Sequence, residues 1–172
     1  LDGDLMLRRL DAAVRLRQEA LDLGAATNAY RLVHAESDGL PGLVVDKVGD
    51  WLVTQIGSLG MLAFIDVLLD RLEETVRPVG ILERASKIAA EEEGLAREDG
   101  VLRGSAPVGP VEVVENGVRY LCEPMTGQKT GWFSDQRENR RALASLARGK
   151  DVLDAFSYVG GFGLAMAKAG AK

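Results

Sequence analysis

The stretch Asp151-Val-Leu-Asp-Ala-Phe-Ser-Tyr-Val-Gly-Gly-Phe-Gly163 decides how the fold is interpreted. A short apolar run, Val152-Leu153, ends in the carboxylate of Asp154, and a loop with three glycines and the helix-forming run 164–169 follow. A Rossmann-like unit begins in this order, with a strand, an acidic residue, a glycine loop and a helix. Glycines let a ligand approach the backbone closely, and the first N–H groups of the helix point toward it. We therefore predict a strand ending at Asp154 and a nucleoside-containing cofactor at the loop.

The spacing between Asp154 and the glycines discriminates between two cofactors. A dinucleotide-binding fingerprint, G-x-G-x-x-G, follows its strand directly, whereas five residues separate Asp154 from Gly160. A carboxylate at the strand end can contact the α-amino group of a methionine moiety, but it would repel a pyrophosphate. The pattern therefore favours S-adenosylmethionine over NAD. The structural alternative is a strand-to-helix turn that binds no ligand.

Four segments of the sequence together resemble one family. They are Asn28-Ala-Tyr-Arg-Leu-Val-His34, Ser37-Asp-Gly-Leu-Pro-Gly-Leu-Val-Val-Asp46, Gly127-Gln-Lys-Thr-Gly-Trp-Phe-Ser-Asp-Gln-Arg-Glu-Asn-Arg140 and Val152-Leu-Asp-Ala-Phe-Ser-Tyr-Val-Gly-Gly-Phe162. The chain closely resembles the class I S-adenosylmethionine-dependent methyltransferases that make 5-methylcytosine in large-subunit ribosomal RNA. Proteins of that family carry an N-terminal PUA domain, a central α+β domain and a C-terminal Rossmann-like catalytic domain.

The resemblance implies that the chain is a fragment with three parts. Residues 1–26 are expected to form the linking helix and residues 27–107 the central α+β domain. Residues 108–172 are then the opening of the α/β Rossmann-like methyltransferase domain. The expected fold class is an α+β domain followed by this incomplete α/β domain.

The resemblance also implies where the cofactor binds. In the family, the segment that corresponds to 127–140 precedes the first strand of the catalytic domain and lies over the cofactor pocket. Carried over, its cofactor-binding or substrate-channel candidates are Lys129, Thr130, Gly131, Phe133, Asp135, Gln136 and Arg137. The candidates from the glycine loop are Asp154, Ala155, Phe156, Ser157, Tyr158, Gly160 and Gly161. The alternative for the first segment is a structural loop that packs Trp132 and Phe133 into the core.

The family chemistry implies an enzyme that uses S-adenosylmethionine and acts on ribosomal RNA. Cytosine C5 is a poor nucleophile until a thiolate adds at C6, so the base must be exposed beside the methyl group. The resemblance places the cysteine nucleophile and the acid that holds the ribose hydroxyls after residue 172. We therefore assign no catalytic residue and predict that these 172 residues alone are inactive. The alternatives are a non-enzymatic RNA-binding or scaffold fragment and, less favoured, half of an NAD-type oxidoreductase.

The composition describes a globular protein of 172 residues, 47% hydrophobic and 27% charged. Its formal net charge of −5 argues against an electrostatic grip on nucleic acid over the whole chain. No apolar run approaches the ~20 residues that a membrane span needs, and we expect no metal site. One cysteine excludes an internal disulfide framework and suits a reducing cytoplasm, where we place the protein. An oligomer is compatible with the sequence.

Periodicity and turn residues predict the remaining elements. We expect a helix at 4–23, strands at 30–34, 43–46 and 51–56, a helix at 60–76, a strand at 79–83 and a hairpin at 111–122. Asn116-Gly117 is a strong signal for a type I′ turn in that hairpin. A further helix is expected to begin near Asp135, because Asp135 and Glu138 have the spacing of a capping box.

Three kinds of polar residue are assigned structural roles. The lone histidine, His34, has no visible partner and is interpreted as a strand residue rather than a general base. The lone cysteine, Cys122, precedes the glycine loop and is interpreted as a small core residue rather than a nucleophile. The arginines of the first helix are interpreted as a solvated face rather than as contacts to RNA phosphates.

Overall fold

A five-stranded sheet organises the larger part of the structure, a computed structural model that describes residues 2–128 and 130–172. In spatial order its strands are β1 (Ala29–His34), β2 (Leu43–Val48), β3 (Trp51–Ile56), β4 (Gly80–Glu83) and β5 (Gly100–Gly104). Neighbouring strands are antiparallel except β3 and β4, which are parallel. A parallel pair needs a crossover connection, which is supplied here by α2 (Leu59–Leu62) and α3 (Ile65–Val76).

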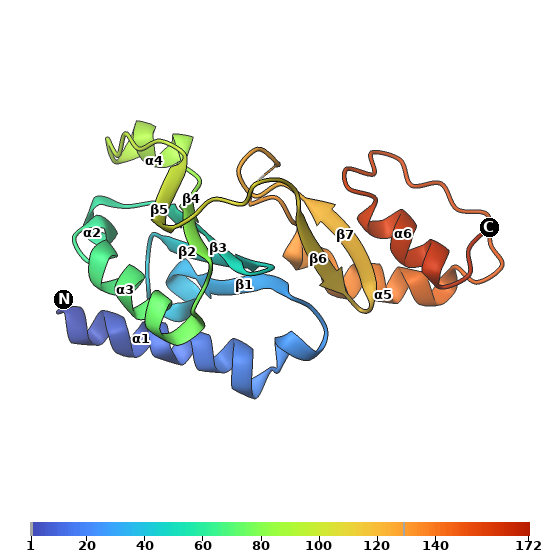
Figure 1. Ribbon diagram of the computed structural model, residues 1–172, viewed down its shortest axis with the longest axis horizontal. Coiled ribbons are helices and arrows are strands. Elements are labelled where there is room, and N and C mark those ends of the chain that lie inside the picture. The colour runs from blue at the N-terminus through green and yellow to red at the C-terminus, as the bar shows by residue number, and fades with distance from the viewer. Residues whose placement is uncertain (1, 129) are drawn as a thin grey trace.

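Two helices, α1 (Gly3–Arg15) and α3, cover one face of this sheet (Figure 1). Asp2 caps α1, because its Oδ1 accepts a hydrogen bond from the N–H of Leu5 at 2.7 Å. Met6, Leu10 and Val14 recur every four residues and are buried against the strands. The helix expected at 4–23 is confirmed in type, although its last turn is a π-turn at Leu16–Ala20.

A two-stranded hairpin covers the other face of the sheet. It consists of β6 (Val111–Glu115) and β7 (Val118–Cys122), and the type I′ turn is confirmed by the positive φ angles of Asn116 and Gly117, 49° and 74°. Side chains alternate along β3, so Leu52 faces the helices while Val53 packs on the hairpin. The side chain of Asn28 ties the hairpin to the start of β1, because its Nδ2 donates to the carbonyl of Glu112 and its Oδ1 accepts from the N–H of Val114.

The last two helices, α5 (Arg137–Leu146) and α6 (Gly161–Lys168), pack together at the far end of the molecule (Figure 1). The capping box expected at Asp135 and Glu138 is wrong. A 3₁₀ turn at Ser134–Gln136 runs directly into α5, so Gln136 occupies the N-cap position and makes no side-chain cap. Glu138 pairs instead with Arg137 and Arg141.

The strand expected to end at Asp154 is also wrong, since residues 151–154 have no regular secondary structure. A strand needs a neighbour to satisfy its backbone groups, and among the described residues none pairs with this segment. The side chain of Leu153 is accordingly 90% exposed. The helix expected at 60–76 is interrupted at Ala63–Phe64, which separates α2 from α3.

The result is a mixed α/β fold with apolar cores on both faces of the five-stranded sheet. The short helix α4 (Lys87–Glu92) lies between β4 and β5 in the chain and ends in an exposed acidic run, Glu91-Glu-Glu93. In the described part of the chain, none of the helices combines the length and apolar character that a membrane span requires. The division at residues 26 and 107 stays a prediction.

Candidate functional site

A cavity of about 370 Å³ lies between the segment that leads into α5 and the glycine loop that leads into α6. Its lining residues come from two stretches of the chain, 128–140 and 156–162, which residues 141–155 separate. They are Gln128, Trp132, Phe133, Asp135, Gln136 and Arg140 from the first stretch, and Phe156, Ser157, Tyr158, Val159, Gly161 and Phe162 from the second. We call this the first cavity.

Tyr158 holds the two stretches together. Its hydroxyl accepts a hydrogen bond from the N–H of Gln128 at 3.2 Å and donates one to the carbonyl of Gly131 at 3.3 Å. Its ring packs edge-on against Phe133, with 5.5 Å between the ring centroids. Gly131 has a φ of +88°, and a Cβ there would lie 2.9 Å from the carbonyl oxygen of Glu123, so only glycine fits this turn.

The start of α6 is fixed from two sides. Oδ2 of Asp154 accepts a hydrogen bond from the N–H of Gly163 at 2.8 Å, while Gly160 takes the left-handed conformation at the N-cap. The buried hydroxyl of Tyr120 on β7 donates to the carbonyl of Gly161 at 3.3 Å. Burial raises the pKa of Tyr120, and the nearby Glu115 carboxylate adds to that effect, so the hydroxyl keeps its proton.

Arg140, which lines the first cavity, belongs to a buried ion pair. The guanidinium of Arg140 donates two hydrogen bonds to Glu115 on β6, at 2.7 and 2.8 Å. It also donates to the carbonyl of Phe133 at 3.0 Å and stacks 4.4 Å from the ring centroid of Trp132. One side chain therefore connects α5, the hairpin and the segment before α5.

Half of the predicted site residues line the first cavity. Those that do are Phe133, Asp135, Gln136, Phe156, Ser157, Tyr158 and Gly161. Gly131 and Gly160 shape the two loops, and Ala155 follows Asp154 in the exposed part of the second loop. Thr130 is buried and donates to Asp46 at 2.7 Å, and Arg137 faces a neighbouring cavity. Lys129 lies outside the described residues.

Sequence reasoning missed five lining residues. These are Gln128, Trp132, Arg140, Val159 and Phe162. All of them fall inside the two motif segments, so their neighbourhood was identified although their side-chain directions were not. Trp132 is 3% exposed, as the structural-loop alternative expects, yet it also borders the cavity. Phe133 is only half-buried and lines the cavity directly.

Cys122 is a core residue, as the sequence predicts. Its side chain is buried in the hairpin core, where the thiol donates a hydrogen bond to the carbonyl of Val111 at an S–O distance of 3.5 Å. Burial raises the pKa of the thiol to about 12, so the nucleophilic thiolate is suppressed at neutral pH. His34 ends β1 with an exposed side chain. Across the described residues, no cluster of three or more histidine, cysteine or acidic side chains suits a metal ion.

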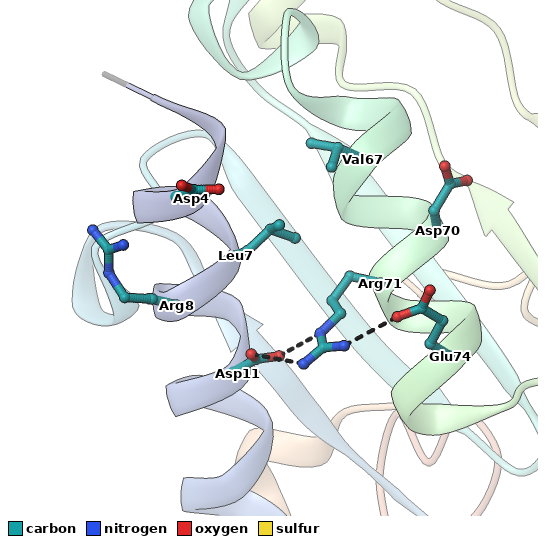
Figure 2. Close-up of a pocket in the computed structure, with 8 residues that line it drawn as sticks. All are labelled: Asp4, Leu7, Arg8, Asp11, Val67, Asp70, Arg71 and Glu74. Carbon is teal, nitrogen blue, oxygen red and sulfur yellow. Dashed lines mark hydrogen bonds and ion pairs between the residues drawn. The ribbon is translucent and has the colours of Figure 1, made fainter.

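A polar groove, separate from the first cavity, lies between α1 and α3. Figure 2 shows Arg71 of α3 reaching between Asp11 of α1 and Glu74 of its own helix. Arg71 donates to both Asp11 oxygens, at 2.9 and 3.0 Å, and to Glu74 at 3.0 Å. These hydrogen bonds hold the pKa of Asp11 below its ordinary value. Because the charged groups of this groove pair with one another, we interpret them as a structural link between α1 and α3.

Residues 98–172, which contain the whole first cavity, match the model of a family described as S-adenosylmethionine-dependent methyltransferase. The chain is also 40% identical over 172 residues to ribosomal RNA large subunit methyltransferase I of Aliivibrio fischeri, and 42% identical over 171 residues to that of Aeromonas salmonicida. These matches cover 100% and 99% of this chain but 43% of each relative. The chain thus spans less than half the length of these relatives.

Two solved structures share the fold. One is a protein from Streptococcus mutans provisionally described as an S-adenosylmethionine-dependent methyltransferase, with a TM-score of 0.81 and 24% identity over 99% of this chain and 43% of that one. The other is a provisionally assigned methyltransferase complexed with SAH, with a TM-score of 0.82, 24% identity and the same coverage. By these matches, residues 98–172 are similar to the S-adenosylmethionine-dependent methyltransferase family, and the whole chain is similar to part of ribosomal RNA large subunit methyltransferase I.

Proposed function

We propose that the protein containing this chain transfers a methyl group from S-adenosylmethionine to large-subunit ribosomal RNA and forms 5-methylcytosine. The proposal is carried by one observation. The first cavity brings together the motif segments 127–140 and 152–162, and both lie inside the region that matches the methyltransferase family. The named activity of the relatives supplies the substrate. Half of an NAD-type oxidoreductase is no longer a useful alternative, because the family is defined by a different cofactor.

The residues of the first cavity fit S-adenosylmethionine. Its volume of about 370 Å³ lies in the usual range for small-molecule sites. Phe133, Phe156 and Tyr158 offer aromatic surface to an adenine ring and to the positively charged sulfonium. Asp135 supplies a carboxylate for a cationic group, and the backbone at Gly161 opens α6, where a ligand carboxylate is stabilised.

Asp154 is not itself a lining residue of the first cavity, but it bonds the first turn of α6, which does line it, and we propose that Asp154 holds the ammonium of the methionine moiety. One of its oxygens, Oδ2, is occupied by the N–H of Gly163, while Oδ1 accepts no hydrogen bond from the rest of the described chain. The bond to Gly163 fixes the direction of the carboxylate, so the free oxygen is already oriented before a ligand arrives. The cofactor supplies an activated methyl group, and these residues bind and orient it beside the RNA base.

We also propose the finer architecture that the resemblance implies. Residues 1–26 are the linking helix, 27–107 a central α+β domain and 108–172 the opening of a Rossmann-like catalytic domain in a cytoplasmic enzyme. The catalytic cysteine is proposed to lie elsewhere in the full-length protein. The chain has one cysteine, and its thiol is buried and protonated. The 172-residue chain is therefore expected to be inactive by itself.

The test is transfer of a labelled methyl group from S-adenosylmethionine to unmodified large-subunit ribosomal RNA. The protein in its full natural length should label the RNA, and nuclease digestion should release the label as 5-methylcytosine. The 172-residue chain should label nothing. Binding of the RNA without any transfer would favour a non-enzymatic RNA-binding protein instead, and label in another nucleoside would refute the proposed product.

A further inference from the structure

A second cavity, of about 420 Å³, lies next to the first and shares two lining residues with it, Trp132 and Asp135. Its other polar side chains come from β1 and from the segment that leads into α5. They include Arg31, His34, Ser134 and Arg137. The two cavities therefore lie on either side of one short segment, and a polymer that enters the first can extend into the second.

Several hydrogen-bond donors at the second cavity are unused. Arg31 employs Nε and Nη2, which leaves Nη1 without a partner in the described structure. Among residues 2–128 and 130–172, Arg137 employs only Nε, in its bond to Glu138. Within the same described residues, neither the His34 ring nor the Ser134 hydroxyl takes part in a hydrogen bond. A half-buried guanidinium with free donors is a site that an anionic oxygen can fill.

Arg31 is held in place before any ligand binds. Its Nε and Nη2 donate to the two oxygens of Asp46 at 2.9 and 3.0 Å, and Asp46 is fixed in turn by the hydroxyl of Thr130 at 2.7 Å. These bonds to Asp46 raise the pKa of Arg31, so the guanidinium stays charged. The side chain is still 36% exposed on its open edge. Because the donor is already oriented, little side-chain entropy remains to be lost on binding.

The charges near the second cavity select the type of anion. Asp46 balances Arg31, Glu138 balances Arg137, and Asp135 adds a negative charge on the shared wall. Because the carboxylates outnumber the guanidinium groups, an anion must be held here by directed hydrogen bonds, and a group with one negative charge is repelled less than a group with two. A phosphodiester has one negative charge, whereas inorganic phosphate near neutral pH is a mixture of ions with one and with two negative charges.

We propose that the second cavity binds a phosphodiester of the RNA strand next to the nucleotide that is methylated, with Arg31 and Arg137 as its donors. The proposal rests on the proposed function and adds to it the path of the substrate. Asp135 and Trp132 separate the neighbouring phosphate from the first cavity. His34 and Ser134 provide further polar contacts at the rim.

The experiment measures RNA binding by fluorescence anisotropy over a series of KCl concentrations. It uses the protein in its full natural length and a labelled, unmodified large-subunit RNA fragment. Arg137→Gln should weaken binding about tenfold. It should also reduce the slope of log K against log salt concentration by about 0.7–0.9, the loss expected for one phosphate contact.

Arg141→Gln is the matched control. Arg141 lies on the same helix, pairs with the same Glu138 and is 70% exposed outside both cavities. The control removes the same charge and should change the affinity less than twofold and leave the salt slope unaltered. Equal effects of the two variants would overturn the proposal, because they would show a response to net charge alone.

Two further measurements complete the test. His34→Ala, at an exposed position, should weaken RNA binding about threefold without a change in melting temperature, and full affinity would remove His34 from the site. Inorganic phosphate, at matched ionic strength, should not displace the RNA; displacement would indicate a small-anion site instead.

The failure of this inference can be told apart from the failure of the proposed function. If the wild type transfers no methyl group to RNA, the proposed function fails. If it does transfer, and Arg137→Gln binds RNA like Arg141→Gln, only this inference fails.

Discussion

The guanidinium of Arg140 on α5 and the carboxylate of Glu115 on β6 form a two-pronged ion pair, with N–O distances of 2.7 and 2.8 Å and both side chains at most 4% exposed. Glu115 ends a strand of the hairpin that packs on the central sheet, whereas Arg140 lines the first cavity. The ion pair therefore links the hairpin directly to the wall of the proposed cofactor site. Its removal should affect both stability and cofactor binding.

Replacing Arg140 by methionine should destabilise the fold by about 3–5 kcal/mol, because Glu115 would be left as an unpaired buried charge. The measurement is urea unfolding followed by circular dichroism. Arg141→Met is the control, since the exposed Arg141 should contribute no more than about 0.5 kcal/mol. Equal stability of the two variants would contradict a structural role for the pair.

Asp154→Asn should separate the two functions of this side chain. The amide oxygen can still accept from the N–H of Gly163, so the turn into α6 and the melting temperature should be kept. Loss of the charge should weaken S-adenosylmethionine binding by about one to two decades, the value of a charge-assisted hydrogen bond. Calorimetry on the full-length protein measures this affinity, with the exposed Asp151→Asn as control. Unchanged affinity in Asp154→Asn would show that the charge of Asp154 does not contribute to cofactor binding.

Phe156→Ala should weaken cofactor binding without weakening the fold. The side chain contributes no core packing, because it is fully exposed at the cavity rim. The φ of Phe156, +61°, is also unfavourable for a bulky residue. Stacking of a base on an aromatic ring is worth about 1–3 kcal/mol, which predicts an affinity loss of about tenfold or more. Leu153→Ala, another exposed apolar residue of this loop, should have no effect on affinity. A similar loss in both variants would indicate a general loop effect.

The thiol of Cys122 should give a specific pH dependence of stability. Its folded pKa of about 12 lies above its ordinary value of 9.0, so the folded state retains the proton where the unfolded state has lost it. The contribution is complete below pH 9 and is lost between about pH 9 and pH 12, at up to about 1.4 kcal/mol per pH unit. The wild type should therefore lose stability relative to Cys122→Ser only above pH 9.

The same variants test whether Cys122 is the nucleophile. Cys122→Ser and Cys122→Ala should retain the proposed methyl transfer nearly intact in the full-length protein. Iodoacetamide should label the wild-type thiol at pH 7.5 only after unfolding. A well-folded but inactive Cys122→Ala enzyme would show that this cysteine attacks the base.

Local signals predicted the parts of the fold that depend on short segments. Asn116-Gly117 specifies its turn through the φ angles that these two residues tolerate, and the stripe of Met6, Leu10 and Val14 specifies the buried face of α1. The strand expected at Val152-Leu153 failed because a strand exists only through a neighbour, which a local pattern does not supply.

The candidate site was predicted at the level of segments rather than side chains. The two motifs identify the loops, but the wall formed by Trp132 and Arg140 depends on Glu115, which lies on the hairpin and outside both motifs. The capping box at Asp135 failed for a similar reason, since the preceding 3₁₀ turn moved the N-cap position from Asp135 to Gln136. The role of the second cavity could not be predicted, because it joins β1 to the segment before α5.

The central claim is that this chain forms part of the S-adenosylmethionine site of an enzyme that makes 5-methylcytosine in large-subunit ribosomal RNA. Mass spectrometry of that RNA, from cells that lack the gene, tests it most directly. The account predicts that one 5-methylcytosine is lost, that the wild-type gene restores it, and that a gene carrying Asp154→Asn restores it poorly while Asp151→Asn restores it fully. An unchanged 5-methylcytosine content in the cells that lack the gene would contradict the account.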